Sequence, residues 1–227
     1  NGDGDELLYI HDGGGVVRSV LGDLRFEQGD YVHIPRGMVH RIIPDSGPVS
    51  STTAAVTWKT LVLVYRDTDV TFTRANGSRY RLQARMSDYM YDLALDTVRR
   101  TVGTANAWSG RMAALKMEII NVPHALTAVE PLGDGYWVGP GSVKPDLDRY
   151  APAGRYDSIF VIFQPKDASG VYLPVPGWGL TLPPGPWANG AGYSSVKTPL
   201  ENWWWTNATY PEEVFIHEWM HQVLFHH

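Results

Sequence analysis

The stretch TYPEEVFIHEWMHQVL, at residues 209–224, predicts an α-helix near the C-terminal end of the chain and sets the fold expected around it. Thr209 suits the N-cap position, and Glu212 stands three residues later as its capping-box partner. Pro211 falls in the first turn, where a missing N–H costs little. One face of this helix is expected to pack in a core. The apolar residues that indicate this face are Val214, Phe215, Val223 and Leu224.

Two histidines stand four residues apart within this helix, at His217 and His221, and Glu218 directly follows the first. Side chains at positions i and i+4 of a helix differ by roughly 40° around its axis, so both imidazoles face one way. This arrangement suits two ligands of one Zn²⁺, and the glutamate between them can act as general base on a metal-bound water. The motif therefore predicts zinc-dependent hydrolysis of an amide bond, with a peptide or protein as substrate.

A hydrolytic zinc site needs a third protein ligand, and the sequence offers His227 six residues after His221. Proteins that use this spacing place a glycine three residues after the second histidine to turn the backbone, and Leu224 stands there instead. On an unbroken helix, His227 would point roughly 80° away from His217. We keep His227 as a candidate ligand beside an alternative, a glutamate or histidine further downstream. In that alternative the metallopeptidase region is truncated at its C-terminal end.

The region from residue 54 onward predicts a domain of mixed α and β structure. Apolar residues recur at three- and four-residue steps over 85–102, which indicates an amphipathic helix. Apolar runs rich in β-forming residues predict strands at 58–65, 113–122 and 158–164, and a short edge strand at 193–196. A Gly/Pro/Trp-rich loop is expected over 174–192. Tyr193 and Tyr210 are candidates for oxyanion or substrate contacts, because a phenol can donate a hydrogen bond to developing charge.

This order of elements resembles the upper half of zincin-type metallopeptidases. The stretches YDSIFVI (156–162) and EVFIHEW (213–219) also resemble a group of exported bacterial proteins that carry the same motif. The resemblance implies an α+β fold with a zincin-like mixed sheet and an active-site helix, and an edge strand that binds the substrate backbone by β-addition. It also implies a secreted or extracytoplasmic location.

Residues 1–45 have a different character, with short strands joined by tight glycine turns. The stretch GDYVHIPRGMVH (29–40) has the glycine, proline and histidine spacing of the second cupin motif, and Glu6 fits the end of the first. The stretch DGDELLYIH (3–11) resembles the N-terminal cupin half of homogentisate 1,2-dioxygenases, which are iron-dependent ring-cleaving enzymes. The resemblance implies a partial β segment with Glu6 and His40 at cupin-motif positions, Fe²⁺ as an alternative metal, and a cytoplasmic location.

The two regions meet at SGPVSSTT (46–53), whose composition predicts a linker. We therefore expect a partial cupin-like β segment over 1–45 and a zincin-like metallopeptidase upper subdomain over 54–227. A ring-cleaving half and a peptidase half make an unusual pair, so a chimera stays open. So does a non-catalytic folded fragment in which both motifs are vestiges.

Composition narrows the classes of function. The formal net charge of −5 and the lack of a basic stripe argue against a nucleic-acid partner. No apolar run approaches the length of a membrane span, so we expect no membrane partner. The absence of cysteine excludes disulfides, thiol catalysis and cysteine-ligated zinc. The oligomeric state stays open.

Overall fold

The structure is a computed structural model that divides into two compact units, Asn1–Ala54 and Ala55–His227. The residues that it describes are 6–19, 21–34, 40–45, 56–109, 113–175, 177, 179–198 and 211–224. Across them it has mixed α and β content, with a mainly β architecture and three α-helices. None of the helices described is both long enough and apolar enough to cross a membrane.

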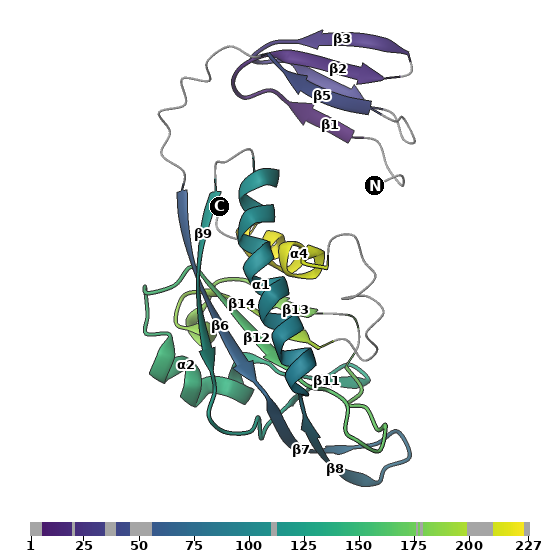
Figure 1. The fold of residues 1–227 in the computed structure, drawn as a ribbon, viewed down its shortest axis with the longest axis vertical. Helices are drawn as coiled ribbons and strands as arrows, with labels where there is room; N and C mark the ends of the chain where they lie inside the picture. Colours follow the sequence, from purple (N-terminus) through teal and green to yellow (C-terminus); the bar gives the residue numbers. More distant parts are fainter. Residues whose placement is uncertain are drawn as a thin grey trace. The chain divides into compact units, whose positions relative to one another are not determined.

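The first unit has five short strands in two small antiparallel sheets, drawn in purple in Figure 1. One sheet pairs β1 (Glu6–Tyr9) with β4 (Tyr31–Ile34). The other has β2 (Gly15–Ser19) between β3 (Gly22–Phe26) and β5 (His40–Pro44). Because alternate strand residues point inward, each strand contributes few side chains to the core. The buried residues of this small core are Val17, Phe26, Val32 and Ile34.

The second unit is built on a five-stranded mixed sheet with the order β13-β14-β12-β6-β9. Its four parallel strands are β14 (Gly192–Lys197), β12 (Ser158–Phe163), β6 (Val56–Tyr65) and β9 (Ala113–Asn121). The edge strand β13 (Gly179–Leu182) runs antiparallel to β14. All six residues of β12 are buried, as expected for a central parallel strand whose two faces are both covered.

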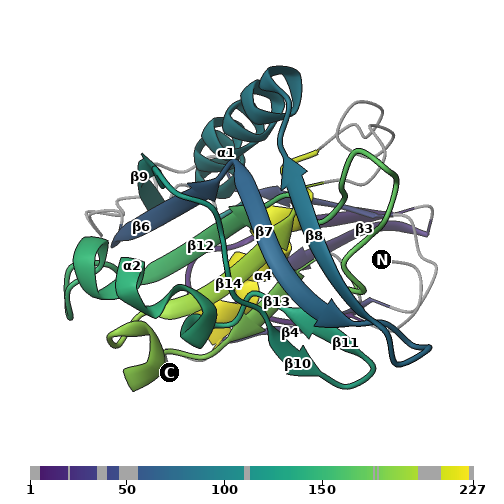
Figure 2. The ribbon, with the colours of Figure 1, turned by 90° about the horizontal axis from the view of Figure 1, so that it is seen from below.

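Helices α1 (Asp88–Trp108) and α4 (Glu213–Leu224) cover one face of this sheet. The other face is covered by α2 (Lys144–Tyr150), by the hairpin of β7 (Asp67–Thr73) and β8 (Arg79–Arg85), and by β10 (Glu130–Leu132) and β11 (Gly135–Trp137). Short 3-10 helices occur at Pro140–Val143 and Pro186–Ala188. Figure 2 shows α1 and α2 on opposite sides of the sheet.

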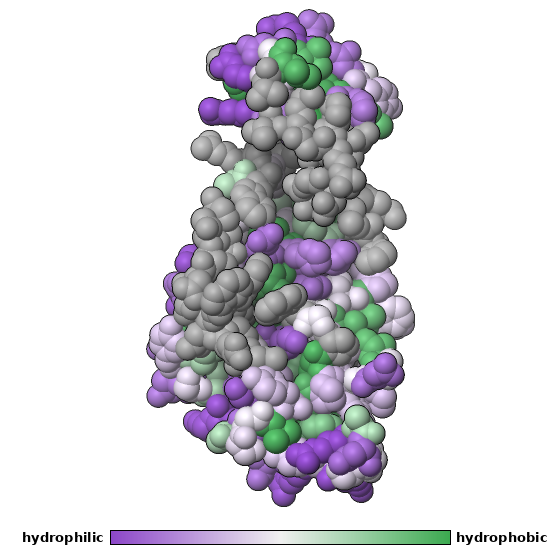
Figure 3. All heavy atoms as spheres, turned by 90° about the vertical axis from the view of Figure 1, so that its right-hand side faces the viewer, coloured by the Kyte–Doolittle hydropathy of each residue, from purple (hydrophilic) through white to green (hydrophobic). Residues whose placement is uncertain are grey.

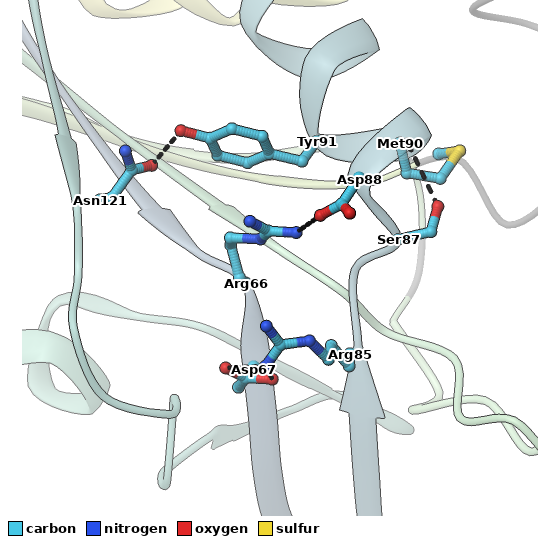
Figure 4. Close-up of polar contacts among 8 residues, drawn as sticks. All are labelled: Arg66, Asp67, Arg85, Ser87, Asp88, Met90, Tyr91 and Asn121. Carbon is cyan, nitrogen blue, oxygen red and sulfur yellow. Dashed lines mark hydrogen bonds and ion pairs between the residues drawn. The ribbon is translucent and has the colours of Figure 1, made fainter.

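Helix α1 begins where the β7–β8 hairpin ends. The Ser87 hydroxyl caps it by accepting the Met90 N–H at 3.2 Å. Arg66, at the end of β6, forms an ion pair with Asp88 in the first turn, where a carboxylate is favourable to the helix dipole. Figure 4 shows these contacts together with the Asp67–Arg85 ion pair of 2.9 Å across the hairpin.

The structure confirms the strands predicted at 58–65, 113–122 and 158–164, and it extends the predicted 85–102 helix at its C-terminal end. Two expectations were wrong. The segment 193–196 belongs to β14, which is an interior strand because β13 pairs with its outer side. The predicted loop over 174–192 contains β13, and this strand is the actual edge of the sheet.

Candidate metal centre on helix α4

Helix α4 presents His217 and His221 on its exposed face, one turn apart. Their Nε2 atoms lie 3.0 Å apart, and their rings are nearly perpendicular, with an interplanar angle of 85°. Two nitrogens bound to one tetrahedral Zn²⁺ at the usual bond lengths lie about 3.3 Å apart. The separation in the structure is that of a hydrogen bond between the two rings, and it is close to that of two ligands of a single ion.

The residues that the structure describes contain no group of three or more His, Cys, Asp or Glu side chains that could hold a metal ion. His227, the candidate third ligand, lies outside the described residues, and so does Tyr210. The described part thus fits zinc with two nitrogen ligands, which is one protein ligand fewer than hydrolytic zinc sites use.

Glu218 lies about 100° around the axis of α4 from His217 and packs against the edge strand β13. Its side chain is buried, and its Oε2 accepts a hydrogen bond from the Thr181 hydroxyl of β13. A Cβ atom added at Gly179, two residues before Thr181, would lie 2.5 Å from Glu218 Oε1. The carboxylate therefore fills a recess in β13.

Aromatic packing fixes α4 on the sheet. Phe215 is fully buried, and its ring lies 5.6 Å from the ring of Phe160 in β12. Trp219 stands edge-on to Trp58 of β6, with ring centroids 6.0 Å apart. Aromatic pairs of this kind add about 0.5–1.5 kcal/mol beyond their buried area. The helix that carries the histidines is therefore firmly anchored on its inner side.

Glu212 lies at the start of α4, and its side chain contacts α1. Its backbone carbonyl accepts the N–H groups of Phe215 and Ile216 at 3.0 and 3.1 Å, so that α4 begins at Glu213. Its carboxylate reaches α1, where it accepts a hydrogen bond of 2.7 Å from Thr104. Thr209, the predicted N-cap, lies outside the described residues. Glu212 thus ties α4 to α1.

Tyr193 lies away from the histidine pair. Its phenol donates a hydrogen bond of 2.7 Å to the carbonyl of Val138, and its ring belongs to the core cluster on the sheet face opposite α4. Burial raises the pKa of this phenol well above its ordinary value. The structure therefore does not bring Tyr193 into the candidate metal centre, because the alternation of strand side chains turns it to the other face.

The cupin-motif positions of the first unit fall on separate sheets. Glu6 lies on β1, opposite Ile34, whereas His40 lies on β5, opposite Ser19. Residues 35–39, in the middle of the second motif, are outside the described residues. The residues described in this unit contain no group of three or more His, Cys, Asp or Glu side chains that could hold a metal ion.

The motifs in the sequence did not indicate a second polar cluster at the carboxyl end of β6. The buried Asp146 of α2 accepts a 2.5 Å hydrogen bond from the Tyr65 hydroxyl, and its other oxygen lies 3.1 Å from His124 Nε2. His124 Nδ1 lies 3.1 Å from the carbonyl of Ala125. Both imidazole nitrogens thus face acceptors, which favours the protonated ring. The residues of this cluster come from three separate segments of the chain, so no local sequence pattern could have predicted it.

A cleft of about 510 Å³ lies beside this end of the sheet, between the β7–β8 hairpin and the loop after β12. Its charged lining residues include Asp67, Asp69 and Arg85 from the hairpin, with Lys166 and Asp167 from the loop. Arg81 and Arg85 are paired with Asp69 and Asp67. Figure 3 shows hydrophilic side chains gathered at the hairpin end of this unit. None of the lining residues comes from α4, so the cleft is separate from the histidine pair.

Comparison with known proteins gave one partial likeness. No protein family matches the sequence. No solved structure matches it. A stretch of 42 residues is 40% identical to the "Putative dioxygenase SSO1533" of Saccharolobus solfataricus. This stretch is 18% of this chain and only 11% of the length of that relative, so it is similar to a small part of a protein described as a dioxygenase.

Proposed function

We propose that the second unit is a zinc-dependent, metallopeptidase-like hydrolase in which His217 and His221 are zinc ligands and Glu218 is the general base. The observation that carries this proposal is the 3.0 Å separation of the two Nε2 atoms on the exposed face of α4. The arrangement of α4 beside an antiparallel edge strand, with α1 packed next to it, supports a zincin-like subdomain. In such a subdomain β13 would bind an extended peptide by strand addition.

Three residues of α4 would have separate roles in the chemistry. His217 and His221 would bind the ion through their Nε2 atoms as neutral imidazoles, with His227 as the candidate third ligand. Bound zinc supplies a Lewis acid and lowers the pKa of a ligated water toward about 7. Glu218 would accept the proton of the attacking water on its carboxylate and deliver it to the leaving amine.

Metal analysis of protein purified without chelator tests the ligand assignment. We expect zinc to co-purify with the wild-type protein, and His217→Ala and His221→Ala to lose most of it. His11→Ala, an exposed histidine of the first unit, is the matched control and should retain the wild-type zinc content. Equal zinc in His217→Ala and in the wild type would overturn the proposal.

Hydrolysis itself is tested with a quenched fluorescent peptide library and zinc-loaded protein. Glu218→Gln should abolish cleavage and keep its zinc, because the carboxylate is assigned to proton transfer and not to metal binding. Cleavage by Glu218→Gln at the wild-type rate would exclude Glu218 as the base.

We propose as a second candidate that the first unit is a fragment of a cupin-type, non-haem iron dioxygenase similar to homogentisate 1,2-dioxygenase. The 42-residue likeness to a protein described as a dioxygenase favours it, and the comparisons support this candidate more than the hydrolase. The described residues do not fit iron, because Glu6 and His40 lie on strands of separate sheets and no group of three or more His, Cys, Asp or Glu side chains among these residues could hold a metal ion. No reaction step is assigned to this unit.

Oxygen uptake by iron-loaded protein with a dihydroxylated aromatic acid tests the second candidate. Uptake that is lost in His40→Ala would support it. No uptake above the buffer control would contradict it, and a protein that binds neither zinc nor iron would support a non-catalytic folded fragment.

A further inference from the structure

A series of side-chain hydrogen bonds runs beneath α4 and ends on Glu218. Gln222 Nε2 donates to Ser194 Oγ of β14 at 2.6 Å. The Ser194 and Thr181 hydroxyl oxygens lie 2.7 Å apart across the β13–β14 pair, and Thr181 Oγ1 bonds to Glu218 Oε2. Ser194 and Gln222 are fully buried, and Glu218 is only 6% exposed. Two turns of α4 are thus joined to two strands by one polar network.

The hydrogen-bonding capacity of these groups gives the polar network a single direction. The Thr181 hydroxyl has one hydrogen, which it donates to Glu218 Oε2. The Thr181 oxygen must then accept the hydrogen of Ser194. Because Ser194 has no further hydrogen, it accepts from the amide of Gln222. Every donor therefore points toward Glu218, and bonds aligned in this way strengthen one another.

Two glycines make room for the two α4 side chains of this polar network. A Cβ at Gly179 of β13 would lie 2.5 Å from Glu218 Oε1 and 2.6 Å from its Cδ. A Cβ at Gly192 of β14 would lie 2.7 Å from Gln222 Oε1. Glu218 and Gln222 are one turn apart on the buried side of α4, just as His217 and His221 are one turn apart on its exposed side.

We propose that Thr181, Ser194 and Gln222 are positioning residues that hold the Glu218 carboxylate in one orientation against β13. This inference rests on the proposed hydrolytic function of α4. A free glutamate side chain samples several rotamers, and a misplacement of about 1 Å in a reacting group can cost about 100-fold in rate. The Thr181 hydroxyl removes that freedom without touching a substrate.

Replacement of Thr181 separates positioning from zinc binding. Thr181→Val keeps the shape and removes the hydroxyl, whereas Thr181→Ser keeps the hydroxyl. With the quenched peptide library, we expect Thr181→Val to lower kcat by about 10- to 100-fold, with KM within about twofold. Thr181→Ser should restore kcat, and both variants should keep the wild-type zinc content. An unchanged kcat in Thr181→Val would overturn the proposal.

Thr101→Val is the matched control for the loss of a buried threonine hydroxyl. Thr101 donates to the carbonyl of Thr97 within α1 and has no part in the polar network. We expect its kcat to equal that of the wild type. A loss of kcat as large as that of Thr181→Val would show a general packing effect and overturn the proposal.

A double-mutant cycle distinguishes failure of this inference from failure of the hydrolytic function. In urea unfolding, Thr181→Val and Glu218→Met should each lower the folding equilibrium constant by about tenfold. The double variant should lose much less than the product of the two losses. Additive losses would overturn the positioning contact whether or not the protein hydrolyses peptides. If the losses are coupled but the wild-type protein hydrolyses no peptide, the coupling would support the contact and the missing activity would overturn the hydrolytic function.

Discussion

The carboxylate of Glu218 occupies the space that a side chain at Gly179 would need. A Cβ on Gly179 would lie 2.5 Å from Glu218 Oε1, well inside the closest approach of real Cβ atoms. Helix α4 therefore lies close to β13 because this strand lacks a side chain there. The relationship couples the fold of the edge strand to the position of the proposed base.

Gly179→Ala should displace the Glu218 side chain and break its hydrogen bond with Thr181. We expect the free energy of unfolding to fall by about 1–3 kcal/mol, from overpacking and from a buried carboxylate left without its donor. Urea unfolding measures this. Gly103→Ala in α1 is the control: its Cβ meets nothing within 4 Å, and alanine should stabilise the helix by about 0.5–1 kcal/mol. A Gly179→Ala protein as stable as the wild type would show that the carboxylate does not need the recess.

Asp146→Asn should destabilise the cluster at the carboxyl end of β6. Asp146 is 5% exposed and accepts hydrogen bonds from Tyr65 and His124, and an asparagine amide turned toward His124 would place donor against donor. We expect a loss of about 1–3 kcal/mol in urea unfolding. Asp148→Asn, on the same helix but half-exposed beside Lys144, should change stability by less than about 1 kcal/mol. Equal effects of the two changes would contradict the buried role of Asp146.

The stability of the second unit should depend on the charge of His124. Two hydrogen bonds raise the pKa of His124 above its ordinary value. The one to the Ala125 carbonyl has the larger effect, and the one to Asp146 has a smaller effect. Burial and the charge of Arg149 act in the opposite direction. A raised folded-state pKa means that the charged ring stabilises the fold. This contribution is fully present below the unfolded pKa of about 6.5 and is lost as pH rises through the folded pKa.

An NMR titration of the His124 ring should give a midpoint above 6.5, the ordinary value. The difference in thermal unfolding midpoint between the wild type and His124→Gln should shrink as the pH rises through that midpoint. Because the His124 side chain is 56% exposed, we expect a small effect. A difference that stays constant from acid to alkaline pH would contradict the assignment.

Phe215→Ala should cost about 3–5 kcal/mol of unfolding free energy, since it removes a fully buried ring that contacts Phe160. Loss of this anchor should also loosen α4 and lower zinc retention. Met220→Ala, on the exposed side of the same helix, should change stability by less than about 0.5 kcal/mol. Calorimetry of the two variants at one pH checks the comparison. A small loss in Phe215→Ala would show that α4 is held by other contacts.

Local patterns predicted the elements that are long or strongly apolar. Strand β12 is a continuous apolar run, and α1 repeats apolar residues with helical spacing, so both were recognisable without any partner. Strand β13 was missed because its four residues, GLTL, are too few to establish an alternating pattern within a loop rich in glycine and proline. It becomes a strand by pairing with β14, and that pairing also converts the predicted edge strand into an interior one.

Only part of the candidate site was predicted from the sequence. The histidine pair follows from spacing along one helix, whereas the hydrogen bond between Glu212 and Thr104 of α1 joins residues far apart in sequence. Tyr193 was a candidate by residue type, and the strand register turned it to the opposite core. Residue type alone could not show which tyrosine faces α4, because a shift of one residue along a strand reverses the face.

The sequence by itself determined that His217 and His221 share one face of a helix, because the helical repeat of 3.6 residues places positions i and i+4 together. It also determined which long segments form buried strands. Only the tertiary structure decided which residues contact Glu218 on that helix. The contacts of Glu218 with Thr181 and Gly179 depend on how β13 pairs with β14 and how α4 packs on both. Such contacts join segments distant in sequence, so their geometry arises only when the sheet and the helix assemble.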